Sequence, residues 1–209
     1  ERHGLPVVGN PVRQEIVALP SPVLRLAERA GRLRLLIIGG SQGAQVFNQI
    51  VPEAVRALPA ENRPQVWHQT GKRDETGVAT AYRAFLPDAK VAAFIEDMAA
   101  AYAWADVVVC RAGAMTIAEL AAAGVAAILV PFPHAADDHQ TENARFLEVR
   151  DAAVLVPQPE LTAMRLTELL TSIGANRALL QRLAINARAC ATTDATETVA
   201  QLCLEAAHA

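Results

Sequence analysis

The chain of 209 residues contains little cysteine, and none of it is paired in the sequence. Cys110, Cys190 and Cys203 lie far apart and form no C-x-x-C motif. An odd number of isolated cysteines argues against a disulfide framework and a zinc site, and it favours the reducing cytoplasm. We therefore expect a cytoplasmic protein in which Cys110, at the end of an apolar run, is a small buried hydrophobic residue.

Long apolar runs and blocks of like charge are also missing. The longest apolar stretch, from Val125 to Phe132, is far too short to span a bilayer. The net charge of −3 is spread along the chain, which predicts no nucleic acid and no anionic membrane surface as a direct partner. No secretory signal precedes Glu1, and no initiator methionine is present, so we expect part of a longer protein.

Short β-branched runs alternate with alanine- and leucine-rich helical segments. The expected strands are Leu35–Ile38, Gln65–Gln69, Val91–Phe94, Asp106–Cys110, Ala127–Val130 and Ala153–Val156. The expected helices are Gln42–Leu58, Glu75–Phe85, Met98–Trp104, Met115–Ala123, Gln140–Val149 and Thr162–Ile173. Uninterrupted apolar strands are buried on both faces, and strict alternation with helices predicts an α/β, Rossmann-like, doubly wound parallel sheet.

No linker or internal repeat divides the chain. From Ala175 onward it is alanine-rich and helical, without a further strand. We expect one domain over residues 1–209, with a core of about residues 8–173 and a helical tail over residues 175–207. Ligands of such sheets bind at the carboxyl ends of the strands, so the loops that follow strands are the places where function is expected.

The first such loop is rich in glycine. Gly39, Gly40 and Gly43 surround Ser41 between an apolar strand and a helix. Glycine lets the backbone approach a ligand, and a helix N-terminus offers N–H groups to a phosphate. The spacing is neither G-x-G-x-x-G nor a P-loop, which disfavours Walker-type ATP hydrolysis. Taken alone, this turn fits a structural role equally well.

The second loop turns at Gly113, after the strand that ends at Cys110. Thr116 and Glu119 have the spacing of a capping box, in which Glu119 would bond a backbone N–H group. Alternatively, the backbone N–H groups near Ala114 face a phosphate or a sugar hydroxyl, and Glu119 accepts hydrogen bonds from a ribose diol. The spacing leaves both interpretations open.

The third loop, over residues 131–143, is crowded with polar groups. Asp137, Asp138 and the histidines His134 and His139 suggest a metal site at first sight. Adjacent residues at the start of a helix do not converge on one ion, so we expect no metal here. Capping of the following helix by Asp137 or Asp138 is the better interpretation.

Two further polar residues of this loop are spaced for joint binding. Gln140 and Asn143 lie three residues apart, so both can face one ligand from the same side of a helix. Together with the two glycine turns, they predict a nucleotide site. The loops alone do not say which nucleotide binds.

These motifs, taken together and in order, resemble the MurG family of bacterial glycosyltransferases, which have the GT-B fold and form glycosyltransferase family 28. The resemblance extends from about Val8 to Pro157. It rests on Gly9–Arg13, Gly39–Ala44, Trp67–Lys72, Phe94–Met98, Tyr102–Asp106, Arg111–Thr116, Pro131–His134 and Gln140–Asn143. It implies the C-terminal, donor-binding domain of a two-domain enzyme whose N-terminal acceptor domain is absent from this sequence.

The resemblance also implies an activity. Such an enzyme transfers N-acetylglucosamine from UDP-N-acetylglucosamine (UDP-GlcNAc) to the 4-hydroxyl of the N-acetylmuramoyl sugar of lipid I, with inversion, in peptidoglycan synthesis. It needs no metal or other cofactor. The catalytic base, the lipid I acceptor site and the contact with the cytoplasmic face of the inner membrane would belong to the absent domain. This chain alone is then expected to bind the donor without transferring sugar.

By resemblance, five positions receive specific roles. Arg13 and Ser41 would lie at the diphosphate, and Ile95 would contact uracil through its backbone. Glu119 would bind the ribose hydroxyls, and Gln140 the hydroxyls of N-acetylglucosamine. Arg13 can instead pair with a nearby surface carboxylate.

The remaining positions are expected to cradle the ligand or to support the fold. His68 and His134 are expected to be structural, and Trp67 and Trp104 to pack in the core. The segment against phosphate and sugar would be Ala114, Met115, Thr116, Ile117 and Ala118. The supporting positions would be Gly39, Gly40, Gly43, Gly113 and Asn143.

Other functions remain open. One is a different GT-B enzyme, such as a lipid glycosyltransferase or a UDP-GlcNAc 2-epimerase. Another is a nucleotide-sugar-binding module without catalysis. A dehydrogenase is disfavoured because G-x-G-x-x-G is missing.

Overall fold

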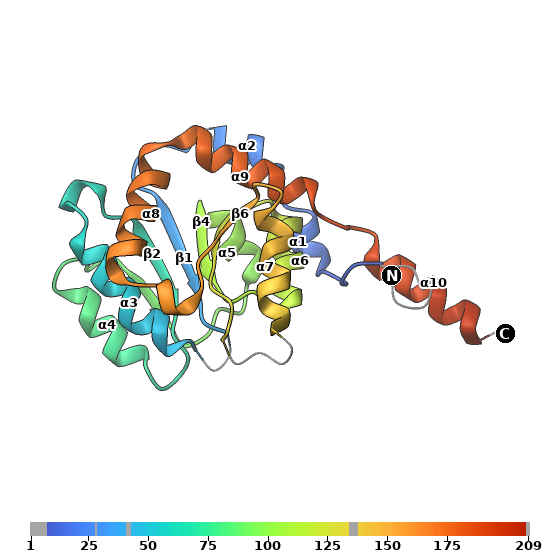
Figure 1. The fold of residues 1–209 in the computed structure, drawn as a ribbon, viewed down its shortest axis with the longest axis horizontal. Helices are drawn as coiled ribbons and strands as arrows, with labels where there is room; N and C mark the ends of the chain where they lie inside the picture. Colours follow the sequence, from blue (N-terminus) through green and yellow to red (C-terminus); the bar gives the residue numbers. More distant parts are fainter. Residues whose placement is uncertain (1–7, 28, 41–42, 134–137, 208–209) are drawn as a thin grey trace.

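The computed structural model describes residues 8–27, 29–40, 43–133 and 138–207, which contain one sheet of parallel strands flanked by helices (Figure 1). The strands are β1 Arg34–Ile38, β2 Gln65–Gln69, β3 Lys90–Ala92, β4 Val107–Cys110, β5 Ala126–Leu129 and β6 Ala153–Leu155. The α-helices are α1 Gln14–Val17, α2 Pro22–Ala27, α3 Gln45–Ala57, α4 Glu75–Arg83, α5 Met98–Trp104, α6 Ala114–Ala123, α7 His139–Glu148, α8 Ala163–Ala175, α9 Arg177–Ala189 and α10 Ala195–Ala207. Short 3-10 helices are Ala60–Asn62 and Gln158–Glu160.

The order of the strands confirms the predicted Rossmann-like sheet. The six strands lie in the order β3-β2-β1-β4-β5-β6, and every pairing is parallel. Ile38 at the end of β1 is level with Gln69 in β2 and with Cys110 in β4. The strand order reverses between β1 and β4, so the loops that follow these two strands lie side by side at the usual ligand-binding point of the fold.

One face of the sheet packs against α3, α4 and α8. Leu35 and Ile37 of β1 enter this layer, where they meet Phe47 and Val51 of α3. These helical residues are four apart and form an apolar stripe toward the sheet. Figure 1 shows α3, α4 and α8 on one side of the strands, and α6 and α7 on the other.

The opposite face packs against α5, α6 and α7. Leu36 and Val108, which alternate with the residues of the first layer, contact this second layer together with Leu120 of α6. Cys110 is fully buried here, which confirms the sequence prediction, and burial raises the pKa of its thiol to about 12. The continuous apolar runs are therefore explained by burial on both faces.

Arginines hold the ends of two helices at the amino edge of the sheet. Arg29 donates to the carbonyls of Ala103 and Trp104 at the end of α5, at 2.5 and 2.8 Å. Arg25 donates to the carbonyls of Ala123 and Gly124 at the end of α6, at 2.7 and 2.5 Å. These carbonyls have no partner within their own helix, and the cations also face the negative ends of the helix dipoles. The cluster fixes both helices from the side opposite the candidate site.

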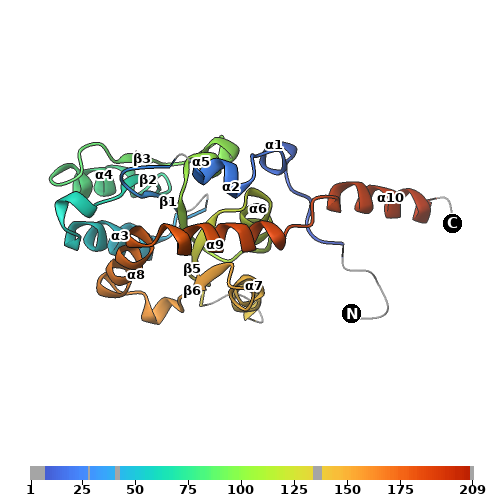
Figure 2. The same ribbon diagram turned by 90° about the horizontal axis from the view of Figure 1, so that it is seen from above.

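The last helix, α10, departs from the body of the fold. Figures 1 and 2 show it projecting away from the sheet. Of its residues, Ala195 alone is buried, while Leu202 and Leu204 are 40% and 56% exposed. Among the described helices, none combines the length and apolar character that crossing a membrane requires.

His68 was predicted to be structural, and it is fully buried in the fold. It lies on β2, has no exposed surface, and its Nδ1 is 3.1 Å from the hydroxyl of Tyr82. Its Nε2 has no hydrogen-bond partner among the described residues. Burial lowers the pKa of His68 from 6.5 to about 3, so the ring stays neutral in the folded protein.

The buried ring makes the stability depend on pH. Below pH 6.5 the unfolded chain binds a proton at His68 that the folded chain does not, so the free energy of unfolding falls from pH 6.5 toward pH 3. At pH 5 the expected loss is about 2 kcal/mol, at 1.36 kcal/mol per pKa unit. Urea unfolding of the wild type and His68→Gln at pH 7.5 and pH 5 measures it. The loss should be smaller in the variant by that amount, and equal losses would show that His68 contributes nothing.

Candidate functional site

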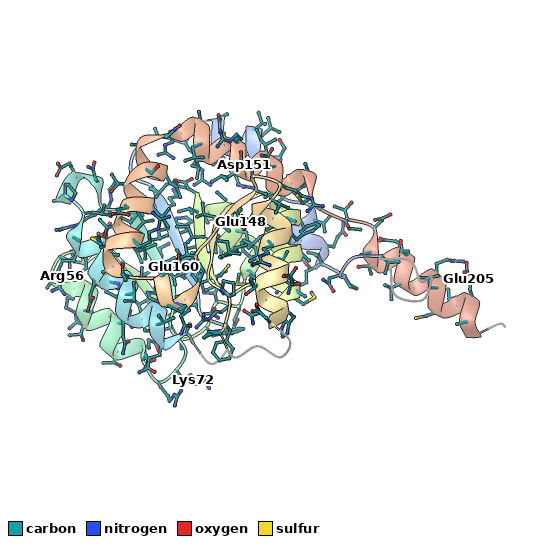
Figure 3. The ribbon with its side chains drawn as sticks, viewed as in Figure 1. Arg56, Lys72, Glu148, Asp151, Glu160 and Glu205 are labelled. Atoms are coloured by element: carbon teal, nitrogen blue, oxygen red, sulfur yellow. The ribbon has the colours of Figure 1, made fainter. Side chains whose placement is uncertain are left out.

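Three loops meet at the carboxyl edge of the central strands. They follow β1, β4 and β5, and the N–H of Val130 donates to the carbonyl of Cys110 at 2.9 Å, which ties two of them together. A cleft of about 640 Å³ opens at this edge. Lys72, in the loop after β2, points away from the body of the fold (Figure 3). The cleft is lined by residues of all three loops, among them Gly39, Gly43, Arg111, Phe132 and Gln140.

Two glycines of the first loop have backbone angles that other residues rarely adopt. Gly40 has φ +77° and Gly43 has φ +74°, and the N–H of Gly43 donates to the carbonyl of Gly40 at 3.0 Å. A Cβ atom at Gly43 would lie 2.0 Å from the carbonyl oxygen of Thr70, whereas at Gly40 it would meet no atom of the described residues within 4 Å. Ser41, predicted at the diphosphate, lies outside the described residues.

These two glycines form a matched pair for mutation. Gly40→Ala should cost about 1 kcal/mol of unfolding free energy, because only the backbone angle is strained. Gly43→Ala should cost about 2 kcal/mol, because the loop must also move away from Thr70. Urea unfolding of both variants measures the difference. Equal costs would show that the close approach to β2 is not a constraint on this loop.

The second loop leads into α6, which begins earlier than the capping-box interpretation requires. Gly113 is the N-cap residue and provides no side-chain cap, and the first intrahelical bond runs from the N–H of Ile117 to the carbonyl of Gly113. Thr116 therefore lies inside the helix, and the predicted capping box is wrong. The N–H groups of Ala114, Met115 and Thr116 have no partner within the helix, and such groups form an anion-binding position.

Glu119 has its partners on two other segments of the chain. Its Oε1 lies 2.9 Å from Nη2 of Arg13, and its Oε2 accepts a hydrogen bond from the hydroxyl of Tyr102 at 3.0 Å. The side chain of Glu119 is 14% exposed and that of Arg13 is 51% exposed. Two predicted site residues thus contact each other directly. The sequence analysis allowed a nearby carboxylate as an alternative partner of Arg13, and that carboxylate is Glu119.

Gln140 and Asn143 fasten the second loop to the third. Oε1 of Gln140 accepts from the N–H groups of Ala112 and Phe132, at 3.2 and 3.0 Å. Nδ2 of Asn143 donates to the carbonyl of Ala112 at 3.0 Å. The supporting role expected for Asn143 has a concrete basis here. Contact between Gln140 and a sugar stays a prediction, and it would have to use the amide nitrogen.

The helix start in the third loop differs in detail from the prediction. Asp138 is at the N-cap position of α7, but it has φ 51° and its side chain makes no cap bond to the backbone. It accepts a hydrogen bond from the hydroxyl of Thr141 at 2.6 Å instead. Asp137 and His134 lie outside the described residues. Within the described ranges, no group of His, Cys, Asp and Glu side chains is arranged to hold a metal ion.

The predicted residues surround the site without lining one common cavity. Ile95 is 4% exposed, and the residues after it, from Glu96 to Ala99, line a hollow of about 400 Å³ together with Arg13. Ala114, Ile117 and Ala118 line a separate hollow of about 400 Å³ on the other side of α6. Gly39, Gly43 and Gln140 line the third opening, the cleft described above. An extended ligand is needed to reach more than one of them.

The part that Arg111 plays at this edge was not predicted from the sequence. Its guanidinium lies 5.0 and 5.2 Å from the ring centres of Phe47 and Phe132, and it donates to the carbonyl of Pro131 at 3.1 Å. It also donates to Oε1 of Gln158 at 2.6 Å. Burial lowers the pKa of Arg111. An arginine directly after a fully apolar strand was the signal available in the sequence.

Comparison with known proteins identifies the family. Residues 34–201 match the glycosyltransferase family 28 C-terminal domain. The chain belongs to glycosyltransferase family 28. This family 28 domain confirms the resemblance found in the sequence, and its fold is that of the C-terminal half of GT-B glycosyltransferases.

Two similar proteins carry the same name. The UDP-N-acetylglucosamine--N-acetylmuramyl-(pentapeptide) pyrophosphoryl-undecaprenol N-acetylglucosamine transferase of Ralstonia nicotianae is 54% identical over 205 residues, which cover 97% of this chain and 56% of that protein. The enzyme of the same name from Marinobacter nauticus is 51% identical over 200 residues, or 96% and 55%. The family 28 domain therefore spans about half the length of these relatives.

Solved structures support the same family assignment and fold. The crystal structure of Acinetobacter baumannii MurG has a TM-score of 0.83 and 38% identity, covering 96% of this chain and 57% of that one. WaaG, a glycosyltransferase involved in lipopolysaccharide biosynthesis, has a TM-score of 0.64 at 16% identity, and at that distance it shows the fold alone.

Proposed function

We propose that this family 28 domain binds UDP-GlcNAc as the donor half of a transferase. The complete enzyme moves N-acetylglucosamine to the 4-hydroxyl of the N-acetylmuramoyl sugar of lipid I, which produces lipid II for peptidoglycan. The names of the relatives, at 51% and 54% identity, support this substrate pair. The structural observation that carries the proposal is the uncapped N-terminus of α6 next to the Arg13–Glu119 pair, at the strand reversal between β1 and β4.

The mechanism follows from the charge that develops when the donor reacts. As the acceptor hydroxyl attacks C1 with inversion, UDP leaves with additional negative charge. The free N–H groups of Ala114 to Thr116 and the guanidinium of Arg13 stabilise that charge without a metal. Glu119 accepts hydrogen bonds from the ribose, the backbone at Ile95 contacts uracil, and Gln140 contacts the sugar.

The other half of the enzyme supplies what this domain does not contain. In this proposal, the preceding domain contributes the catalytic base, the lipid I site and the contact with the membrane. The complete protein is then peripheral on the cytoplasmic face of the inner membrane. The domain alone binds UDP-GlcNAc weakly and transfers nothing.

Calorimetric titration with UDP-GlcNAc, UDP-glucose, UDP-galactose and NAD tests the proposal. UDP-GlcNAc should bind more tightly than the other two nucleotide sugars, and NAD should not bind. A preference for UDP-galactose, or binding of NAD in place of UDP-GlcNAc, would contradict the assigned donor. Turnover of lipid I by this chain alone would contradict the division of labour between the two halves.

A further inference from the structure

Tyr102 lies beneath Glu119 and is not among the residues predicted to bind ligand. It comes from α5, is 1% exposed, and donates its hydroxyl hydrogen to Oε2 of Glu119 at 3.0 Å. Burial, followed by the charge of Glu119, raises the pKa of Tyr102, so its hydroxyl keeps the proton and acts as the donor. A buried donor thus contacts one oxygen of a carboxylate that faces the site.

The position of Tyr102 is fixed from both ends of α5. Asp97 caps the start of the helix by accepting from the N–H of Ala100 at 2.8 Å. Arg29 binds the carbonyls of the last helical turn, as described above. The ring itself belongs to the core layer that contains Leu120 and Ile117 of α6. The hydroxyl therefore cannot follow Glu119 if the carboxylate moves.

The second oxygen of Glu119 has an exposed partner, in contrast to the buried Tyr102. Arg13 reaches Oε1 from α1's N-cap position, and its side chain is 51% exposed. An ion pair this exposed is weak because solvent and side-chain entropy oppose it. A ligand hydroxyl can replace such a partner far more easily than it can replace a buried tyrosine.

We propose that Tyr102 is a positioning residue that aims the carboxylate of Glu119 at a ribose diol, and that Arg13 occupies the place the ribose takes. This inference rests on the proposed function. Binding of the nucleotide breaks the Arg13–Glu119 pair, and the released guanidinium pairs with the diphosphate of the same ligand. Ribose recognition and diphosphate recognition are thereby coupled through one exchange of partners.

The first test compares UDP with 2′,3′-dideoxy-UDP, which lacks the diol. The dissociation constant of the dideoxy ligand divided by that of UDP measures recognition of the ribose. Tyr102→Phe should lower this ratio about five- to tenfold, the order expected for a lost hydrogen bond to a charged group, with little change for the dideoxy ligand. Tyr82→Phe is the matched control, because Tyr82 is equally buried but its hydroxyl meets His68.

A cycle with Glu119→Ala separates positioning from general support of the fold. If Tyr102 acts through the carboxylate, Tyr102→Phe should leave the ratio unchanged in the Glu119→Ala background, which has no side-chain acceptor for the tyrosine hydroxyl. An unchanged ratio in the single variant, or equal weakening of both ligands, would overturn the positioning role. A wild-type chain that fails to bind UDP at all would instead refute the proposed function, and the inference with it.

Arg13→Ala tests the exchange of partners. The variant should bind UDP about tenfold more weakly, because the diphosphate loses a cation. Uridine, which has no phosphate, should bind no more weakly than to the wild type, because nothing has to be displaced from Glu119. Equal weakening of UDP and uridine would contradict the exchange.

Discussion

Replacing Glu119 with alanine is expected to weaken binding of UDP about 100-fold, which corresponds to about 2.7 kcal/mol. The ribose diol loses a carboxylate acceptor in a position that is 14% exposed, and hydrogen bonds to charged groups are worth more than neutral ones. Binding of 2′,3′-dideoxy-UDP should not weaken, because it makes no use of Glu119 and Arg13 becomes free. Isothermal titration calorimetry with the two ligands measures both effects.

A carboxylate distant from the site serves as the control. Glu168 on α8 also faces an exposed arginine, Arg165, at 3.5 Å, so Glu168→Ala makes the same change of charge. It should leave both dissociation constants within about twofold, since an exposed charge so placed acts weakly. If Glu119→Ala leaves UDP binding unchanged, or weakens the binding of both ligands equally, Glu119 does not bind the ribose.

Replacing Asp106 with alanine is expected to lower the free energy of unfolding by about 4 kcal/mol. Asp106 is 2% exposed, lies 3.7 Å from Arg29 and 3.3 Å from Arg177, and accepts from the N–H of Arg34 at 3.0 Å. The variant would leave the backbone N–H of Arg34 without its acceptor and the largely buried guanidinium of Arg29 without its counter-ion, a loss that typically costs about 3–5 kcal/mol. Urea unfolding measures the change.

An exposed ion pair provides the comparison for Asp106. Asp88 pairs with Arg32 at 3.0 Å, and its side chain is 54% exposed. Asp88→Ala should cost less than about 1 kcal/mol. If Asp106→Ala and Asp88→Ala lower the free energy of unfolding equally, the contacts of Asp106 with the arginines at the amino edge are not a source of stability. UDP binding by folded Asp106→Ala should remain, since this edge is opposite the site.

The strands were predictable from sequence because they are buried on both faces. Uninterrupted apolar runs such as Val107 to Val109 are typical of strands in the middle of a parallel sheet, and their alternation with helices then indicated the fold. The end of one strand was predicted incorrectly: the strand predicted to reach Phe94 ends at Ala92. The short helices α1 and α2 were not predicted, because each has too few residues to show a helical period.

The site was predictable as a set of loops, whereas its contacts were not. Residues Arg13 and Glu119 are 106 positions apart, and they meet because α1 packs beside α6. No local pattern encodes such a contact. Tyr102 was assigned no role for a related reason, since a buried aromatic residue in an alanine-rich helix is normally part of the core.

At two helix starts the capping side chain differs from the prediction, and Asp137, the other predicted cap, lies outside the described residues. Spacing suggested a capping box at Thr116, but Gly113 already begins α6. Asp138 lies at the predicted cap position of α7, and its backbone is in the left-handed region. Its side chain accepts a hydrogen bond from the hydroxyl of Thr141 and makes no bond to a backbone N–H group. Spacing of polar residues indicates a helix start without determining which residue provides the cap.

Chemical-shift mapping by NMR tests the central claim most directly, because it locates the ligand on the fold. UDP-GlcNAc added to the ¹⁵N-labelled chain should shift the amide signals of Ile95, residues 112–119 and Gln140, which surround the strand reversal. Signals near Leu58 and Leu170, which line a hollow between α3 and α8, should not move. Shifts confined to that hollow, or no shifts at millimolar UDP-GlcNAc, would contradict a donor site at the carboxyl edge of β1 and β4.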